Sequence, residues 1–380
     1  MKRIKISCGD SAIASSDGSN PMITKFLPGR KNIWKNCEFF WNDKSVKKAD
    51  YWFVIGDVFD AQESCEVDAN NLILMTSEPP SIRRYDTSEE FVKQFGRIAT
   101  CHSDFRYGKF FSSKPPINWW IDAGNPIKTQ VEFDEWNGAG LGYDDFKKLR
   151  EIKKEKLLSV FCSAKIFTEG HKARYDFCKK LQEHFKDKVD WFGSGVRPIV
   201  DKWDGVAPYK YHIALENFSG PNYWTEKLMD PLMVLTHPIY CGATNIRDFF
   251  SEEQVSMIDI RYPKTAIAKI EKLIEGNFYE KNLAEALKAR DLVMDEYNLF
   301  NLITQITEDD AKSGLSSFKP QFKKIKKEEF FLPKSGLEPT RRRKNFLQRI
   351  KKSVAKKLKK LSNYFADYFF LARFRMFENS

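Results

Sequence analysis

The chain has 380 residues, of which 42% are hydrophobic and 14% aromatic. This composition excludes a disordered chain, and the length allows two domains of ordinary size, each with its own core. The net charge of +11 is concentrated in residues 341–360, where eleven Lys and Arg occur without an acidic residue, so the rest of the chain is electrically balanced. The charge therefore gives no sign that the body of the protein binds nucleic acid.

Short apolar runs alternate with helical segments over about residues 1–145. The runs are rich in β-forming residues and end in turn-forming ones, which is typical of strands. This alternation predicts an α/β domain with a mostly parallel sheet and helices packed on it. The predicted strands are 4–6, 37–41, 51–55, 72–75 and 97–101, with a helix at 89–95.

A candidate catalytic carboxylate follows the predicted strand 72–75. Glu78 is followed by two prolines, Pro79 and Pro80, which prevent a helix and favour an extended loop. A carboxylate at the carboxyl end of a strand can face a cleft and act as a general base. The residues alone leave open that Glu78 is a solvated loop acid.

A second α/β domain is predicted over residues 153–310, after irregular structure at 112–150. Its first strand, 157–162, precedes a helix at 171–185 whose apolar residues recur at four-residue spacing. Arg174 lies early in this helix. Its planar guanidinium can bond two phosphate oxygens at once, although a solvated helix Arg has the same spacing.

A buried-type strand at 211–215, together with the loop and helix after it, is the part of the chain around which the rest is organised. Glu216 and Asn217 stand at the carboxyl end of this strand, where open α/β sheets bind ligands. The loop at 218–222 has turn chemistry.

A helix start comes directly after this loop. Thr225 is a good N-cap for a helix that begins Glu226-Lys227. The free N–H groups and the dipole of a helix N-terminus both favour an anion. Lys227 at that place indicates phosphate.

Three stretches, YKYHIALENF (209–218), YWTEKL (223–228) and HPIYCGATNI (237–246), resemble the sugar-nucleotide signature of glycosyltransferase family 10, the α1,3/1,4-fucosyltransferases, and the spacing resembles that of the bacterial members. A thinner likeness runs over most of residues 50–305. The resemblance implies a GDP-fucose donor, inversion at the sugar carbon, no required metal, and two Rossmann-like domains facing a cleft (the GT-B type).

The resemblance also implies roles for single residues. Glu78 would be the general base, and the donor would be bound by Arg174, Glu216, Asn217, Tyr223, Thr225, Glu226 and Lys227. Among these, Arg174 and Lys227 would bind the phosphates, Tyr223 the guanine and Glu226 the ribose. Phe218 and Trp224 depart from the family pattern. Another sugar nucleotide, or a non-catalytic transferase-like protein, therefore stays open.

The chain lacks the usual sequence signals of a bound metal or a disulfide framework. It contains no Asp-x-Asp motif, and its seven cysteines lack CxxC spacing, so we expect reduced thiols and no metal cofactor. His212 is interpreted as a core histidine. Cys241 lies beside the proposed donor site, but no base is identified next to it, and we do not expect a catalytic thiol.

The C-terminal part is predicted to contain a linker, 311–340, and a basic amphipathic tail, 341–380. Apolar residues of the tail, beginning with Phe346 and Ile350, recur at four-residue spacing among its basic residues. Such a helix binds anionic lipid in a membrane interface, although packing on the body or binding of nucleic acid stays an alternative. With no apolar N-terminal leader, we expect a cytoplasmic protein, peripheral at the inner face of the membrane. Family likeness indicates an acceptor containing GlcNAc, in a surface polysaccharide or lipopolysaccharide O-antigen, joined through an α1,3-type linkage.

Overall fold

The computed structural model describes residues 1–9, 21–85, 88–102, 105, 108–121, 140–199, 201–315 and 319–331. Residues 1–328 form one unit, and the chain from residue 329 belongs to another. The predicted tail, 341–380, lies outside the described residues. Among the residues described, no helix is long and apolar enough to cross a bilayer.

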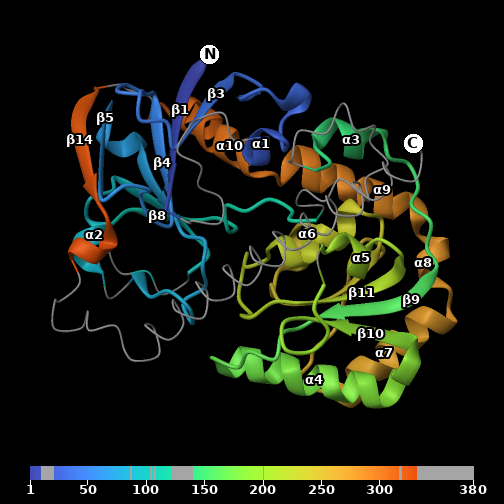
Figure 1. The fold of residues 1–380 in the computed structure, drawn as a ribbon. Coiled ribbons are helices and arrows are strands. Elements are labelled where there is room, and N and C mark those ends of the chain that lie inside the picture. The colour runs from blue at the N-terminus through green and yellow to red at the C-terminus, as the bar shows by residue number, and fades with distance from the viewer. Residues whose placement is uncertain are drawn as a thin grey trace, which may run out of the picture. The chain divides into compact units, whose positions relative to one another are not determined.

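The first sheet is built from the N-terminal strands and is parallel apart from one edge, where β2 runs antiparallel to β3 (Figure 1). Its central strands are buried on both faces, as parallel strands covered by helices are. In spatial order the strands are β2 (Ile33–Trp34), β3 (Cys37–Trp41), β1 (Lys2–Cys8), β4 (Tyr51–Ile55), β6 (Leu72–Met75), β7 (Arg97–Thr100) and β8 (Phe110–Ser112).

The second sheet is entirely parallel. Its strands in spatial order are β10 (Val189–Phe192), β9 (Lys156–Phe161), β11 (Tyr209–Leu215), β12 (His237–Cys241) and β13 (Ser256–Met257). The α/β class with two parallel-type sheets is therefore confirmed. The arrangement of two domains facing a cleft stays a prediction.

Helices cover both faces of the second sheet (Figure 1). One face packs on α4 (Glu169–Phe185) and α7 (Pro263–Glu275) through a shared apolar core. On the other face, α6 (Glu226–Met233) packs with α9 (Leu283–Asp291). The remaining helices are α1 (Pro21–Thr24), α2 (Glu89–Val92), α3 (Tyr143–Lys148), α5 (Trp203–Val206), α8 (Phe278–Lys281) and α10 (Leu299–Lys312).

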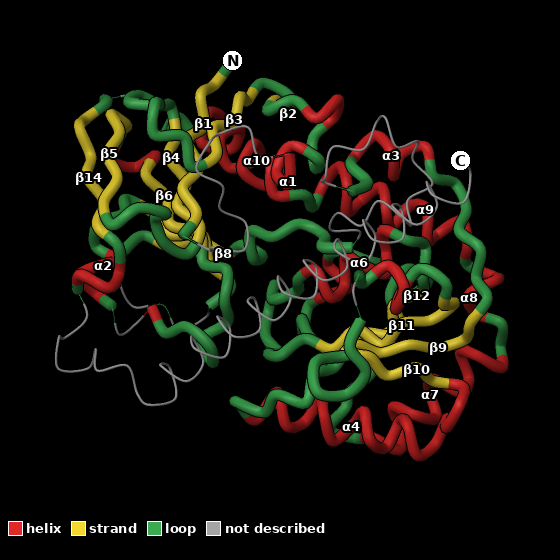
Figure 2. Tube along the Cα trace, viewed as in Figure 1, coloured by secondary structure: helices red, strands yellow, loops and turns green. Residues whose placement is uncertain are grey.

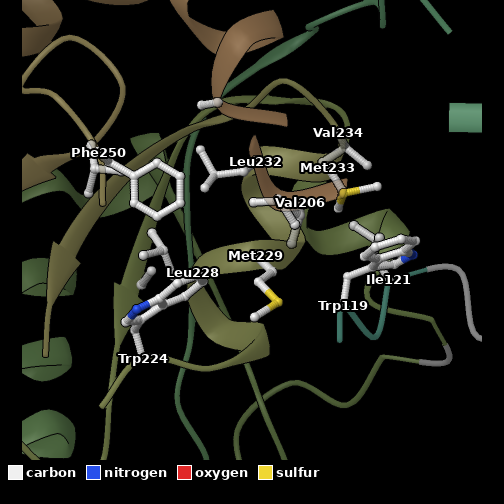
Figure 3. Close-up of a cluster of buried hydrophobic side chains, with 14 of the residues drawn as sticks. Trp119, Ile121, Val206, Trp224, Leu228, Met229, Leu232, Met233, Val234 and Phe250 are labelled. Atoms are coloured by element: carbon white, nitrogen blue, oxygen red, sulfur yellow. The ribbon is translucent and has the colours of Figure 1, made fainter. Parts of the chain in front are cut away.

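A cluster of aromatic and aliphatic side chains surrounds α6 (Figure 3). Trp119 and Ile121, from the segment that follows the first sheet, belong to the same cluster as Trp224, Leu228 and Met229. Burying each such side chain contributes about 1.5–3 kcal/mol. This cluster fixes the helix whose first turn carries the candidate donor residues.

The chain after the second sheet returns to the first one. Helix α10, which we placed at the end of the second domain, contributes Leu299, Phe300 and Ile303 to the core of the first sheet. Beyond it, β14 (Gln321–Lys326) pairs antiparallel with β5 (Gln62–Val67), within the stretch predicted as a linker (Figure 2). β14 and β5 form a two-stranded sheet of their own, and α10 packs on the core of the first sheet.

Candidate functional site

A buried carboxylate lies at the carboxyl end of β11. The side chain of Glu216 is fully covered. Its oxygens accept hydrogen bonds from the Thr225 hydroxyl at 2.8 and 2.9 Å and from the Thr225 amide at 2.7 Å. Burial raises the pKa of Glu216, and the Lys227 ammonium opposes that rise. Glu216 therefore organises the turn between strand and helix.

Helix α6 begins at the residue the sequence predicted, Glu226, with Thr225 as its N-cap. The Thr225 hydroxyl accepts a hydrogen bond from the Lys227 amide at 3.4 Å. The Glu216 carboxyl group therefore occupies the N–H of the N-cap residue at this helix start.

Two lysines flank the carboxylate of Glu226. Lys227 Nζ lies 3.1 Å and Lys202 Nζ 3.8 Å from Glu226 Oε1, and Lys227 also lies 3.7 Å from Glu216. Burial would raise the pKa of Glu226, but the two ammonium groups lower it to about 2. Burial would lower the pKa of Lys227, yet the carboxylates of Glu226 and Glu216 hold it above its ordinary value. These pKa shifts keep the side chains of Glu226 and Lys227 charged at neutral pH.

Lys202 connects the first turn of α6 to its second, a role that the sequence did not reveal. Its ammonium lies 2.6 Å from Asp230 Oδ2. The other Asp230 oxygen accepts hydrogen bonds from the backbone N–H groups of Trp120 and Ile121 at 2.6 and 2.9 Å. Residues this far apart in sequence give no local signal of such a network.

Arg174 is a buried cation with spare hydrogen-bonding capacity. It lies in the second turn of α4, is 7% exposed, and donates from Nη1 to the Leu215 carbonyl at 3.2 Å. Its buried Nε has no partner among the described residues. An unpaired guanidinium N–H in a protein interior favours binding of an anionic oxygen.

The pocket beside Arg174 has a volume of about 570 Å³, which suits a nucleotide-sized ligand. Three predicted donor residues line it, namely Arg174, Glu216 and Asn217. Tyr223, Thr225, Glu226 and Lys227 are not part of this lining among the described residues. The other lining residues are Gly170, Ala173, Phe218, Ser219, Cys241, Gly242, Thr244, Met257, Ile258, Asp259, Ile260 and Arg261.

Asp259 and Arg261 were not predicted as site residues. They follow β13 as Glu216 follows β11, so they stand at the same edge of the second sheet. Arg261 donates from Nε and Nη2 to the Asp259 carboxylate at 2.7–3.0 Å. Their position after a strand was the signal in the sequence that could have identified them.

The floor of the pocket requires a glycine. A Cβ atom at Gly242 would lie 2.5 Å from the Glu216 side chain and 2.1 Å from the Tyr240 hydroxyl. Both neighbours are fully buried, so neither has room to move. Any larger residue at position 242 would displace Glu216 from its bonds with Thr225.

Tyr223 is buried behind the pocket. Its hydroxyl donates to Asn217 Oδ1 at 2.9 Å, and its ring packs edge-on against Phe218. Burial raises the pKa of Tyr223, and the negative charges of Glu216 and Glu78 add to this effect. In this structure Tyr223 orients Asn217, and contact with a guanine stays a prediction.

Glu78 stands three residues beyond β6, in an exposed bend. Its backbone carbonyl bonds His102 Nε2 at 2.8 Å. The predicted loop placement at a strand end is confirmed, and the role of general base stays a prediction.

The two other side chains singled out in the sequence behave as expected. His212 is buried, bonds Ser159 through Nδ1 at 2.8 Å, and burial lowers its pKa to about 3. Burial raises the pKa of the Cys241 thiol, which disfavours the thiolate. His212 is thus a neutral core residue, and the raised pKa makes Cys241 a poor nucleophile.

The described residues contain no group of three or more His, Cys, Asp or Glu side chains that could hold a metal ion. All seven cysteines are unpaired, as expected for reduced thiols. Metal-independent chemistry stays a prediction.

Comparison with known families identifies the domain that holds the pocket. Residues 152–276 match the family described as "Glycosyltransferase family 10 (fucosyltransferase) C-term". The match contains Arg174, the whole of β11 and α6, and every residue that lines the pocket. Glu78 lies outside it.

The chain is also similar in sequence to curated proteins. The chain is 30% identical to alpha-(1,3)-fucosyltransferase B of Drosophila melanogaster over 268 residues, which are 64% of this chain and 55% of the relative. It is 32% identical to GDP-fucose protein O-fucosyltransferase 3 of Xenopus laevis over 113 residues, 24% of each chain. The chain thus spans about half the length of the first relative and a quarter of the second.

Among solved structures, the chain is similar to an α1,3-fucosyltransferase with GDP-fucose, with 14% identity, a TM-score of 0.42, and coverage of 78% of this chain and 90% of that one. It is also similar to Anabaena Alr3699/HepE in complex with UDP-glucose, with 9% identity, a TM-score of 0.42, and coverage of 82% and 100%. Scores this low do not bear on the function.

Proposed function

We propose, from the glycosyltransferase family 10 domain that residues 152–276 form, that the protein transfers fucose from GDP-fucose to a hydroxyl group of a glycan acceptor. The observation that carries this proposal is the pocket beside Arg174, whose Nε–H has no partner in the described part of the chain. The curated relatives named above are fucosyltransferases. The acceptor class we propose contains GlcNAc, in an α1,3-type linkage.

In the proposed reaction the acceptor oxygen attacks the anomeric carbon of fucose, with inversion. The bond between that carbon and the phosphate oxygen breaks, and GDP leaves with the bonding electrons. Glu78 takes the proton of the attacking hydroxyl. Arg174 and Lys227 stabilise the charge that grows on the diphosphate, so that no metal is required.

The charges near the pocket support this assignment. Lys202 lies beside the carboxyl groups of Glu226 and Asp230, and Lys227 lies beside those of Glu216 and Glu226. A diphosphate that binds here competes with Glu226 and Glu216 for Lys227. Arg174 can bind the same ligand without giving up a carboxylate partner.

We therefore expect Arg174→Met to weaken binding of GDP and GDP-fucose by about 10- to 150-fold, which corresponds to losing about 1.5–3 kcal/mol from a charge-assisted contact. Titration calorimetry measures both ligands. Lys179→Met is the matched control, because Lys179 is an exposed cation farther along α4 that does not line the pocket. Equal affinity of the Arg174 variant and the wild type would refute the phosphate assignment.

A panel of sugar nucleotides tests the donor itself. GDP-fucose, GDP-mannose, UDP-glucose and UDP-N-acetylglucosamine are compared by calorimetry and then by release of nucleotide diphosphate in the presence of an N-acetyllactosamine acceptor. We expect tight binding of GDP-fucose and transfer from it alone. Preference for another sugar nucleotide would replace fucose in the proposal, and binding without transfer to any acceptor would favour a non-catalytic protein.

We further propose that residues 341–380 hold the enzyme at the cytoplasmic face of a membrane, near a lipid-linked acceptor. The support is the composition of the segment, in which eleven Lys and Arg lie among regularly spaced apolar residues.

Deleting residues 341–380 should release the protein from vesicles that contain anionic lipid, because each basic residue near such a surface contributes about 1 kcal/mol. Co-sedimentation with phosphatidylglycerol vesicles at low salt measures this. Turnover of a soluble acceptor should survive the deletion. A full-length protein that stays in the supernatant would contradict the membrane role.

A further inference from the structure

The loop that carries Glu78 is held at its start by the neighbouring strand β7. The Thr76 amide donates to the Ala99 carbonyl at 3.0 Å, and the Thr76 hydroxyl bonds that of Thr100 at 2.8 Å. Two residues on, the carbonyl of Glu78 bonds the His102 ring. These contacts hold the start of the loop against β7 and His102.

After Glu78 the chain makes a tight turn. The Pro79 carbonyl accepts hydrogen bonds from the amides of Ile82 and Arg83 at 2.9 and 3.0 Å. Arg83 is thereby joined through the backbone to the residue that follows Glu78. Any displacement of Arg83 would be transmitted to the base over one hydrogen-bonded turn.

Arg83 is in turn held by a residue from the far end of the chain. Its Nη2 lies 2.6 Å from Glu328 Oε2 and 3.8 Å from Asp57 Oδ2. The Ser88 hydroxyl donates to the other Glu328 oxygen at 2.5 Å. The side chains of Arg83, Asp57 and Glu328 are only 24%, 16% and 18% exposed, so solvent screens these ion pairs less than surface pairs.

Aromatic rings continue the connection from Arg83 toward Glu78. The guanidinium lies 4.6 Å above the ring of Tyr85, which is fully buried. The Tyr85 ring packs against His102 with centroids 5.8 Å apart. His102 is the residue that bonds the Glu78 carbonyl. Arg83 is therefore connected to Glu78 in two ways. One is the hydrogen-bonded backbone turn, and the other is the packing of the Tyr85 and His102 rings.

Glu328 follows β14, which forms a two-stranded sheet with β5. All six residues of β14 pair with β5, from Gln321 opposite Val67 to Lys326 opposite Gln62. The Lys327 amide continues the pairing by donating to Ala61 at 3.1 Å. Because six paired residues precede it, Glu328 is a fixed point of attachment and not the end of a loose chain.

We propose that Arg83 and Glu328 are positioning residues that hold the Glu78 loop in its catalytic geometry, so that the chain beyond residue 310, outside the matched family 10 domain, completes the active site. This inference rests on the proposed function, in which Glu78 is the general base. A base must stay within hydrogen-bond reach of the attacking hydroxyl, and a shift of about 1 Å can lower turnover by about 100-fold.

Glu328→Gln tests the proposal because it removes the charge and keeps the shape. We expect kcat for transfer from GDP-fucose to N-acetyllactosamine to fall by about 10- to 100-fold, with the GDP-fucose Kd unchanged. Hydrogen exchange should become faster in the peptide that covers residues 76–85 and stay the same in β11. Glu329→Gln, at the exposed neighbouring position, is the control and should match the wild type in all three measurements.

A double-mutant cycle separates coupling from a general loss of stability. If Arg83 acts through Glu328, Arg83→Gln combined with Glu328→Gln should lower kcat no further than either change alone. If the double variant instead lowers kcat by the product of the two single effects, the two residues act independently and the proposal is overturned. Ser88→Ala removes only one bond to Glu328 and should give a smaller change in the same direction, which keeps the test valid if Glu328→Gln unfolds.

The outcomes distinguish this inference from the proposed function. Full activity of Glu78→Gln would remove the base assignment and with it the positioning role. An inactive Glu78→Gln together with wild-type kcat and wild-type exchange in Glu328→Gln would overturn the positioning role alone. Slower transfer with faster exchange confined to residues 76–85 would support it.

Discussion

Replacing Glu78 with Gln is expected to lower turnover by about 10²- to 10⁴-fold, the usual contribution of a general base. The amide keeps the shape of the side chain but cannot accept the proton of the attacking hydroxyl. Affinity for GDP-fucose should stay close to that of the wild type, because a base acts in the transition state and the donor pocket is built by residues 152–276.

Initial rates at saturating GDP-fucose, with calorimetry of the donor, measure these two effects separately. Glu89→Gln is a suitable control, since Glu89 is a carboxylate on α2 that pairs with the exposed Lys93. EDTA should leave the wild-type rate largely intact. Full turnover of the Gln variant would show that Glu78 is a solvated loop acid. Complete inhibition of the wild type by EDTA would show that the reaction requires a metal.

Azide offers a sharper test of the same assignment. Azide is an anion at neutral pH, so its attack on the anomeric carbon needs no base. Glu78→Ala supplied with GDP-fucose and azide should therefore form fucosyl azide and release GDP, although the same variant barely uses a sugar acceptor. Failure of both nucleophiles in a folded variant that binds donor would show that Glu78 does more than remove a proton.

The local sequence was sufficient to predict the apolar strands inside the first sheet. The predicted strands 37–41, 51–55 and 72–75 match β3, β4 and β6 residue for residue. These strands are covered on one or both faces, so their hydrophobic runs are long and clearly bounded. Hydrophobic burial alone identifies such segments.

The sequence did not predict β14, because this strand forms by pairing with a distant segment. β14 has the sequence QFKKIK and buries only Ile325, so its composition is typical of a solvated segment. It becomes a strand because β5, more than 250 residues earlier, offers a free edge. The predicted linker therefore contains the element that places Glu328.

The hydrophobic period of residues 278–297 predicts one continuous helix, but the structure interrupts it for a local reason. Asn277 has a left-handed backbone with φ 49°, and Asn282 leaves the helical region at φ −120°. The Asn282 side chain bonds the Phe278 carbonyl, which an uninterrupted helix would bond through its backbone. α8, α9 and a π-helical turn, Leu292–Glu296, replace the single helix.

For the site, sequence identified the residues on β11 and α6 but not their electrostatic partners. Strand ends and helix caps are local features, which is why Glu216 and Thr225 could be recognised. Lys202 and Asp230 could not, because an ion pair between them depends on how α5 and α6 pack. The ion pairs around α6 therefore become visible only in the folded structure.

Lys114 should give the largest change in stability of any single substitution we propose. Lys114 is 6% exposed, and among the described residues its ammonium has two distant carbonyl partners, Pro115 at 3.4 Å and Ile117 at 3.5 Å. It lies 5.0 Å above the Trp224 ring, which is a weak compensation for lost hydration. Burial lowers the pKa of Lys114 to about 7 from an ordinary 10.5.

Lys154 in the same chain provides a comparison, because its ammonium is hydrogen-bonded differently. It is a half-buried lysine whose pKa is also lowered by burial. Its ammonium, however, donates to three oxygens at 2.7 Å, the carbonyls of Ala207 and Val234 and the hydroxyl of Thr236. Lys154→Met would leave these acceptors without a donor and should lower the free energy of unfolding by about 1–3 kcal/mol.

Lys114→Met should have the opposite sign, because methionine fills a similar volume without a charge to bury. Between pH 7 and 10.5 the unfolded Lys114 binds more protons than the folded one, so its presence makes stability rise with pH over that range. At pH 6 both states are protonated and the burial cost is complete, and we expect the substitution to raise the free energy of unfolding by about 3–5 kcal/mol. At pH 10 the gain should be much smaller. Urea midpoints of the wild type and both variants at pH 6 and pH 9 measure these differences. A Lys114→Met variant that is less stable than the wild type at pH 6 would contradict the prediction. It would show that the ammonium is stabilised by contacts stronger than its two carbonyls and one ring.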